Sequence, residues 1–207
     1  MAIRSRLMLV LGTVLAAAGC SSQDPVGIRV NLEQSGSGTI AVAALSLPEI
    51  SREVAGGSKG VDWSMDARLN VTTGSFKGLD GIAIEDLRIR SSEFEGDESG
   101  TIRISIPCGT DAKWFRSLHV SPSDRGMLRK ALDQSINEIE LHENVTIVVA
   151  VDGARVAGSL ARPVPRVTVG SKADTCTVVM PLEILESRTD PLVLVLNWER
   201  PIQTATR

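Results

Sequence analysis

Strict alternation of apolar and polar side chains is the feature that most constrains the fold of this chain. Residues 27–33, 63–72 and 101–106 each place an apolar side chain at every second position, with polar residues between them. This period of two matches a β-strand, whose successive side chains point to opposite faces. The apolar run at 145–151 and the continuously apolar run at 192–196 are too short to cross a membrane. They predict interior strands, and the second is expected to be buried on both faces.

Shorter patterns of the same kind predict five more strands, at 39–47, 82–94, 154–159, 166–169 and 175–185. The sequence Ser-Gly-Ser-Gly at 35–38 supplies a turn that joins the first two strands as a hairpin. Residues 74–81 are expected to form a loop. The tetrapeptide Ser-Gly-Thr-Ile occurs at 37–40 and again at 99–102. Either a duplicated hairpin unit or coincidence accounts for this repeat.

One amphipathic helix is predicted at about 122–139. Ser121 is a suitable N-cap, Pro122 fits the first turn, and an acidic residue follows at Asp124. Four apolar residues at helical spacing form one stripe: Leu128, Leu132, Ile136 and Ile139. A shorter helix is expected at 48–55. The predicted fold class is therefore α+β: mainly antiparallel β-sheet in a single domain over 26–200, with the helix packed on the sheet and a loose tail at 201–207.

The first nineteen residues have the features of a signal peptide. Arg4 and Arg6 precede an apolar stretch at 7–15, and small residues follow it. The apolar stretch is shorter than the roughly 20 residues that a membrane span needs. The sequence Ala17-Ala18-Gly19-Cys20 resembles the lipobox of bacterial lipoproteins. The alternative is an ordinary secretory signal that happens to end in a cysteine.

The lipoprotein resemblance implies an exported, membrane-anchored protein. In that class a signal peptidase removes the leader, here residues 1–19, and the cysteine thiol, here that of Cys20, carries a diacylglyceryl group. The new amine is often acylated as well, with chains such as palmitate, and two or more chains hold a protein firmly to a bilayer. Ser21 stands where an inner-membrane retention signal has aspartate, which implies the outer membrane in a two-membrane bacterium. Residues 20–25 are expected to be a short lipidated tether.

Composition narrows the possible partners. Removing Arg4 and Arg6 with the leader leaves 20 basic and 25 acidic residues, a net charge of about −5. This balance argues against nucleic acid as a partner and against charge-driven adhesion to anionic lipid. The chain has three Trp, three Phe and no Tyr, so it is poor in the rings that bind sugars or stack on bases.

Cys108 and Cys176 remain after Cys20 is assigned to the lipid. Two thiols in an exported, oxidising compartment predict a disulfide. The alternative is two separately buried, reduced cysteines. A catalytic role is a third possibility, but no histidine lies in a recognisable signature near either residue.

The sequence contains no recognisable catalytic or cofactor motif. His142-Glu143 begins like the zinc-protease motif, but residue 146 is Thr, and His119 is the only other histidine. Glu95, Asp97 and Ser99 imitate the first half of an EF-hand calcium loop. The position of the bidentate glutamate in that loop is occupied by Ile106, so a polar hairpin turn is the simpler interpretation.

These observations favour a non-enzymatic binding or assembly module of the cell envelope. Its expected partner, beyond the membrane that the lipid enters, is an envelope protein, a lipid or a wall component. One alternative is an envelope hydrolase whose catalytic residues form no recognisable motif. Another is a lipid-carrying module, which predicts an apolar cavity between helix 122–139 and the sheet.

Overall fold

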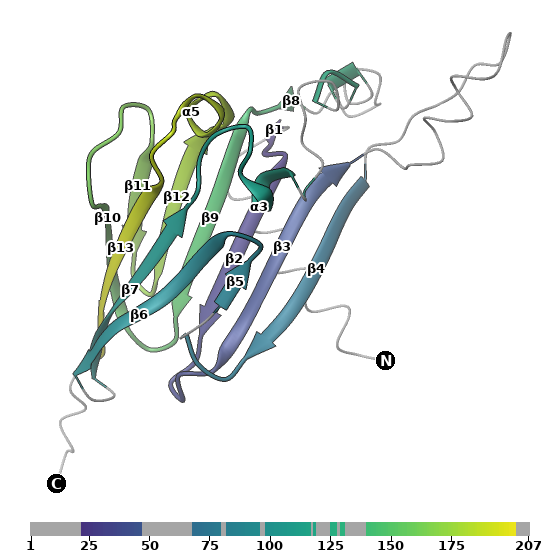
Figure 1. Ribbon diagram of the computed structural model, residues 1–207. Helices are drawn as coiled ribbons and strands as arrows, with labels where there is room; N and C mark the ends of the chain where they lie inside the picture. Colours follow the sequence, from purple (N-terminus) through teal and green to yellow (C-terminus); the bar gives the residue numbers. More distant parts are fainter. Residues whose placement is uncertain are drawn as a thin grey trace, which may run out of the picture.

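Two facing β-sheets form most of the part of the chain that the structure describes. The computed structural model describes residues 22–46, 68–79, 82–95, 98–116, 118, 125–127, 129–130 and 140–201. Within them lie the two sheets, a two-stranded ladder at one end, and the short helices α3 (Lys113–Arg116) and α5 (Leu182–Ser187) (Figure 1). Among these residues no helix is long and apolar enough to cross a membrane.

The first sheet has five strands, and every neighbouring pair is antiparallel. In spatial order the strands are β10 (Arg155–Leu160), β13 (Leu192–Glu199), β7 (Ser99–Ile106), β6 (Leu87–Glu95) and β5 (Ile82–Ile84). The strand β13 therefore lies between β10 and β7, inside the sheet.

The second sheet has six strands and one parallel pair. In spatial order they are β11 (Thr168–Lys172), β12 (Thr175–Pro181), β9 (Asn144–Val151), β2 (Val26–Leu32), β3 (Gly38–Ser46) and β4 (Arg68–Phe76). The pair β2–β9 is parallel and the other pairs are antiparallel. The ladder at one end pairs β1 (Ser22–Gln23) with β8 (Glu140–Leu141), also in parallel.

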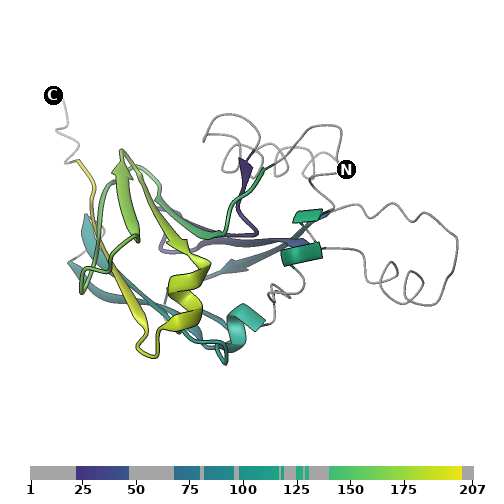
Figure 2. The same cartoon turned by 90° about the horizontal axis from the view of Figure 1, so that it is seen from above.

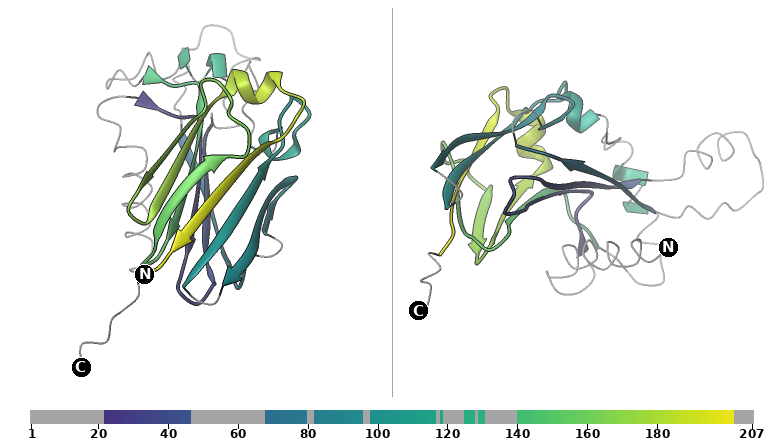
Figure 3. Two further views of the ribbon diagram at one scale, coloured as in Figure 1. Left: turned by 90° about the vertical axis from the view of Figure 1, so that its left-hand side faces the viewer. Right: turned by 90° about the horizontal axis from the view of Figure 1, so that it is seen from below.

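The alternating residues of both sheets meet in one core. Val26, Ile28, Val30 and Leu32 of β2 are at most 2% exposed, and they belong to the same buried cluster as Ile102, Ile104 and Ile106 of β7. Burying each such side chain contributes about 1.5–3 kcal/mol. The sheets are closest where β10 of one lies beside β11 of the other, and Figures 2 and 3 show them diverging toward β4.

The predicted strands are largely confirmed, with three corrections. The segment 82–94 is a hairpin rather than one strand, because Glu85 adopts a left-handed conformation (φ 53°) in a turn between β5 and β6. The segment 175–185 leaves the sheet after Pro181 and continues as α5. The strand β4 continues to Phe76, into the predicted loop.

The apolar run 192–196 is a central strand, but only one of its faces is fully buried. Leu192, Leu194 and Leu196 lie in the core, whereas Val193 and Val195 are half-buried on the outer face. The strand buried on both faces is instead β9, in which the five residues 145–149 are all buried.

The mainly antiparallel β architecture is thus observed, while the predicted helix packing stays a prediction. Of residues 122–139, only 125–127 and 129–130 are described, and these are helical. The leader at 1–19, the helix at 48–55, the first part of the strand at 63–72 and His119 lie outside the described residues.

The two Ser-Gly-Thr-Ile sequences place a glycine under an aromatic ring at a strand start. Gly38 pairs with Phe76, and a methyl group on Gly38 would lie 2.5 Å from the end of that ring. Gly100 pairs with Trp198, and a methyl group there would lie 2.9 Å from the indole. At Gly38 the nearest atom to such a methyl group is the Asn31 carbonyl oxygen, at 2.0 Å, so the backbone also excludes a side chain there. Each glycine leaves room for a cross-strand aromatic side chain, and one of the two lies in each sheet.

Candidate functional site

The N-terminal junction, residues 22–25, is bound to other parts of the fold from Ser22, two residues after Cys20. Ser22 and Gln23 pair with Glu140 and Leu141, and the carbonyl of Pro25 accepts a hydrogen bond from the Leu45 amide at 2.8 Å. The tether expected over 20–25 is therefore wrong from Ser22 onward. These residues are part of the folded structure.

Asp24 is the polar centre of this junction. Its carboxylate accepts hydrogen bonds from the Thr146 hydroxyl and, at 3.4 Å, from the Asn144 side-chain amide. His142 Nδ1 lies 3.6 Å from Asp24 Oδ1. These contacts anchor the first residues of the fold to the start of β9.

The Asp24 cluster contains the residue types of a catalytic triad in the wrong order. In a triad the imidazole lies between the hydroxyl and the carboxylate, so that it can take the hydroxyl proton. Here the carboxylate of Asp24 lies between Thr146 and His142. The arrangement orders the chain but does not activate the hydroxyl.

The adjacent Glu143 forms an ion pair with Arg129. The described residues contain no group of three or more His, Cys, Asp or Glu that could hold a metal ion.

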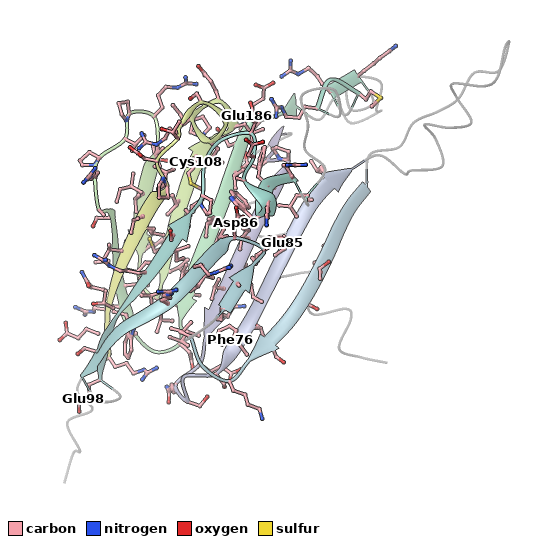
Figure 4. The ribbon with its side chains drawn as sticks, viewed as in Figure 1. Phe76, Glu85, Asp86, Glu98, Cys108 and Glu186 are labelled. Atoms are coloured by element: carbon pink, nitrogen blue, oxygen red, sulfur yellow. The ribbon has the colours of Figure 1, made fainter. Side chains whose placement is uncertain are left out.

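Cys108 and Cys176 are free thiols, so the predicted disulfide is wrong. Cys176 packs against Gly158 of β10. Gly158 pairs with Leu196 of β13, and Leu196 pairs with Ile102 of β7, so Cys176 lies at the height of Ile102 along the strands. The strand β7 runs from Ile102 to its end at Ile106, a distance of roughly 13 Å, and Cys108 lies two residues beyond that end. A disulfide requires Cα atoms within about 7 Å. In Figure 4 Cys108 lies toward the α5 end of the molecule, and the amide of the next residue, Gly109, donates a hydrogen bond to the Leu185 carbonyl at 2.6 Å.

Both thiols are poorly suited to act as nucleophiles. Burial raises the pKa of Cys108, although the Leu192 amide and the charge of Arg188 oppose the effect. Burial also raises the pKa of Cys176, against a hydrogen bond with the Ser171 side chain. A raised pKa keeps a cysteine in the unreactive thiol form at neutral pH.

The proposed calcium residues lie at the hairpin between β6 and β7. Glu95 pairs directly with Ser99 across the hairpin, and Asp97 lies outside the described residues. Ile106, which occupies the twelfth position of the imitated loop, is 0% exposed in the core. An EF-hand needs an oxygen ligand at that position, so this segment is not an EF-hand loop.

The outer face of the five-stranded sheet carries a cluster of arginines. Arg90 of β6 pairs directly with Arg103 of β7, and Arg88 lies two residues from Arg90 on the same face. Arg90 and Arg103 are exposed, whereas Arg88 is half-buried and donates a hydrogen bond to the Glu85 carbonyl. We call these three side chains the arginine face. The alternation predicted that each would point away from the core, but only the register of β6 on β7 brings them together.

A shallow cavity of about 550 Å³ lies at the end of the same sheet. The starts of β7 and β10 and the end of β13 line it, and its charged residues are Glu98, Arg155, Glu199 and Arg200. The Arg200 guanidinium lies 4.8 Å from the centroid of the Trp198 ring, which is 3% exposed. Two acids and two bases leave this cavity without a dominant charge. A second shallow cavity of about 540 Å³ lies at the β11–β12 turn.

Comparison with known protein families, curated sequences and solved structures finds no match to this chain. The class defined by the structure is therefore an architectural one: a two-sheet β-sandwich with a charged outer sheet face.

Proposed function

We propose that this protein is a lipid-anchored, non-enzymatic binding module of the bacterial cell envelope. Signal peptidase removes residues 1–19, and Cys20 becomes the lipidated N-terminus. The observation that carries the proposal is the position of Ser22, which pairs with Glu140 in the β1–β8 ladder, so only Ser21 stands between this paired residue and Cys20 in the sequence. A tether this short favours a body held in one orientation near the membrane.

The arrangement of the sheets supports a defined outward surface. The strand β1 lies on the outer side of the six-stranded sheet, and the five-stranded sheet lies on the opposite side of the molecule (Figures 2 and 3). A lipid at Cys20 then holds the β1 side nearest the membrane. The outer face of the five-stranded sheet is presented to the envelope space, where a protein or wall component can reach it.

The described surfaces support binding more than catalysis. The two cavities above are shallow, and the hydroxyl, carboxylate and imidazole at Asp24 are not ordered for proton transfer. Neither cavity lies between a helix and a sheet, as a lipid-carrying module would require. Within the described part of the chain, no specific observation favours the hydrolase or the lipid carrier.

The proposal includes the helix predicted over 122–139 and its packing on the sheet, at the end where α5 follows β12. Arg125 supports this position, because its guanidinium forms an ion pair with Glu186 of α5 at 2.6 Å. Both side chains are largely buried, at 12% and 21% exposed, so the contact lies within a packed region. Arg129, one helical turn later, pairs with Glu143 before β9.

Replacing Cys20 tests the anchor. Cys20→Ser removes the thiol that accepts the lipid, and we expect the protein to move from the membrane pellet to the soluble envelope fraction. Cys108→Ser is the matched control, because it alters a thiol that the structure places inside the fold. Labelling with a radioactive fatty acid should follow the same pattern. Membrane association of Cys20→Ser equal to that of the unmodified sequence would refute the proposal.

A further inference from the structure

The arginine face is an unbalanced cationic cluster on an acidic protein. Arg90 and Arg103 are directly opposite one another, a position at which like charges repel and destabilise a sheet. No ion pair neutralises Arg88, Arg90 or Arg103 among the described residues. Glu85 and Asp86 lie in the turn before β6, and the Asp86 carboxylate accepts hydrogen bonds from the backbone amides of α3. Along β13 the nearest carboxylate is that of Glu199, four residues from Val195, which pairs with Arg103. That separation is about 13 Å.

The spacing of the three guanidinium groups favours a compact, multiply charged anion. Directly opposed residues on a sheet have Cβ atoms about 5 Å apart. Residues two apart on one strand are about 7 Å apart. The exposed side chains of Arg90 and Arg103 can therefore converge on one group, and Arg88, whose guanidinium also donates to the Glu85 carbonyl, lies beside them. A phosphate ester offers three acceptor oxygens and a charge of about −2, whereas a carboxylate offers two oxygens and one charge. Ser105, which pairs with Arg88 on the same face, adds a hydroxyl donor.

We propose that the arginine face binds a phosphate ester of a ligand in the envelope space, outside the anchoring membrane. The direction of the arginine face indicates the source of the phosphate ester. The face lies on the side opposite β1, so the headgroups of the membrane that holds the lipid lie on the far side of the molecule (Figure 3). The inference deepens the proposed function and rests on its binding role. Its test uses the purified mature chain in solution and does not depend on the anchor.

Binding is measured by titrating the mature chain with inorganic phosphate, following backbone amide signals by NMR, at constant ionic strength. Acetate is the reference anion. We expect phosphate to shift the signals of β6 and β7 at concentrations at least 10-fold below acetate. Arg103→Gln and Arg90→Gln should each weaken phosphate binding at least 10-fold. Arg103→Lys, which keeps the charge but loses the planar fork, should weaken it about 3-fold.

The matched control is Arg162→Gln, which removes an exposed arginine in the loop after β10 and should leave binding unchanged. Thermal unfolding separates a binding role from a structural one. Arg103→Gln removes the repulsion with Arg90, so its melting temperature should equal or exceed that of the unmodified chain. A lower melting temperature would show that Arg103 stabilises the fold, and it would overturn the inference.

Two further probes decide between ligand classes. Polyphosphate should compete with phosphate more strongly than polyglutamate of equal charge; tighter binding of polyglutamate would overturn the phosphate assignment in favour of an acidic protein. Vesicles of phosphatidylglycerol should bind the unlipidated chain no better than neutral vesicles. Vesicle binding that Arg103→Gln abolishes would overturn the assigned source. Equal affinity for phosphate and acetate would overturn the proposal even if the anchor test succeeds.

Discussion

Contact between Gly158 and Cys176 predicts a strong size constraint where the two sheets meet. A methyl group on Gly158 of β10 would lie 2.3 Å from Cys176 Sγ of β12, more than 1 Å inside normal contact. Cys176 is 0% exposed, so its sulfur has little room to move away. Overpacking of this kind costs about 1–3 kcal/mol. We therefore expect Gly158→Ala to lower the free energy of unfolding by about 2 kcal/mol.

A second substitution should relieve the clash. In Cys176→Ala the sulfur is absent, and the remaining Cβ would lie 3.5 Å from the new methyl group, an ordinary contact. Alone, Cys176→Ala should cost about 1 kcal/mol for the lost buried atom and the small cavity. The double variant should also lose about 1 kcal/mol, which corresponds to a coupling of about 2 kcal/mol between the two sites.

Urea unfolding of the mature protein in reducing buffer measures these differences. Gly170→Ala on the neighbouring β11 is the matched control, because nothing lies within 4 Å of a methyl group there. Its unfolding midpoint should differ little from that of the unmodified chain. Additive losses in the double variant would refute the reasoning, since they would mean that the sulfur does not limit the size of residue 158.

Two further substitutions test the contacts that hold α3. The Asp86 carboxylate accepts hydrogen bonds from the backbone amides of Lys113 (3.0 Å) and Trp114 (2.8 Å), so Asp86→Ala should cost about 1 kcal/mol in unfolding free energy. Although burial acts to raise the pKa of Asp86, these hydrogen bonds and the Lys113 charge outweigh it and lower the pKa. The stabilisation is therefore complete above the unfolded-state pKa of about 4 and is lost as the pH falls through the lower folded-state value. Unfolding curves from pH 7 to pH 3 should show the deficit of Asp86→Ala shrinking; a constant deficit would contradict this. Trp114→Phe removes an indole N–H that donates a hydrogen bond to the Pro107 carbonyl at 2.8 Å. Because the Trp114 side chain is 0% exposed, thermal unfolding should show a loss of about 2 kcal/mol in the free energy of unfolding. No loss would contradict the contact.

Alternation predicted the strands whose faces have different environments. Residues 27–33 and 101–106 appear as β2 and β7. Each strand has a core face and an outer face, so its apolar and polar side chains alternate. The Glu85 turn was missed for a physical reason. No glycine or proline marks it, since Glu85 adopts the left-handed conformation usually reserved for glycine. The short helix α5 was missed because Leu182 and Leu185 continue an apolar segment that already predicted a strand.

The arginine face depends on register, which no local pattern encodes. Arg88 and Arg90 alternate with Leu87 and Ile89, so their outward direction is predictable from the sequence. That Arg90 lies opposite Arg103 depends on the hairpin, whose pairing shifts at the irregularity between Ser92 and Phe94. The position of the cysteines likewise depends on topology. Two thiols in a chain with an export signal predict a disulfide, but the topology places Cys108 beyond the end of β7 and Cys176 against Gly158 in the core.

The parallel pairing of β2 with β9 has a consequence for how the protein folds. Val26 pairs with Val145, which is 119 residues later in the chain. The β2–β3 hairpin can close as soon as its own residues have been synthesised, but the neighbour on the other side of β2 does not yet exist. Long-range pairing of this kind slows folding and leaves strand edges open meanwhile. During synthesis, β2 therefore lacks its second neighbour until the last third of the chain has been made, so a chaperone has its longest opportunity to act before β9 is complete.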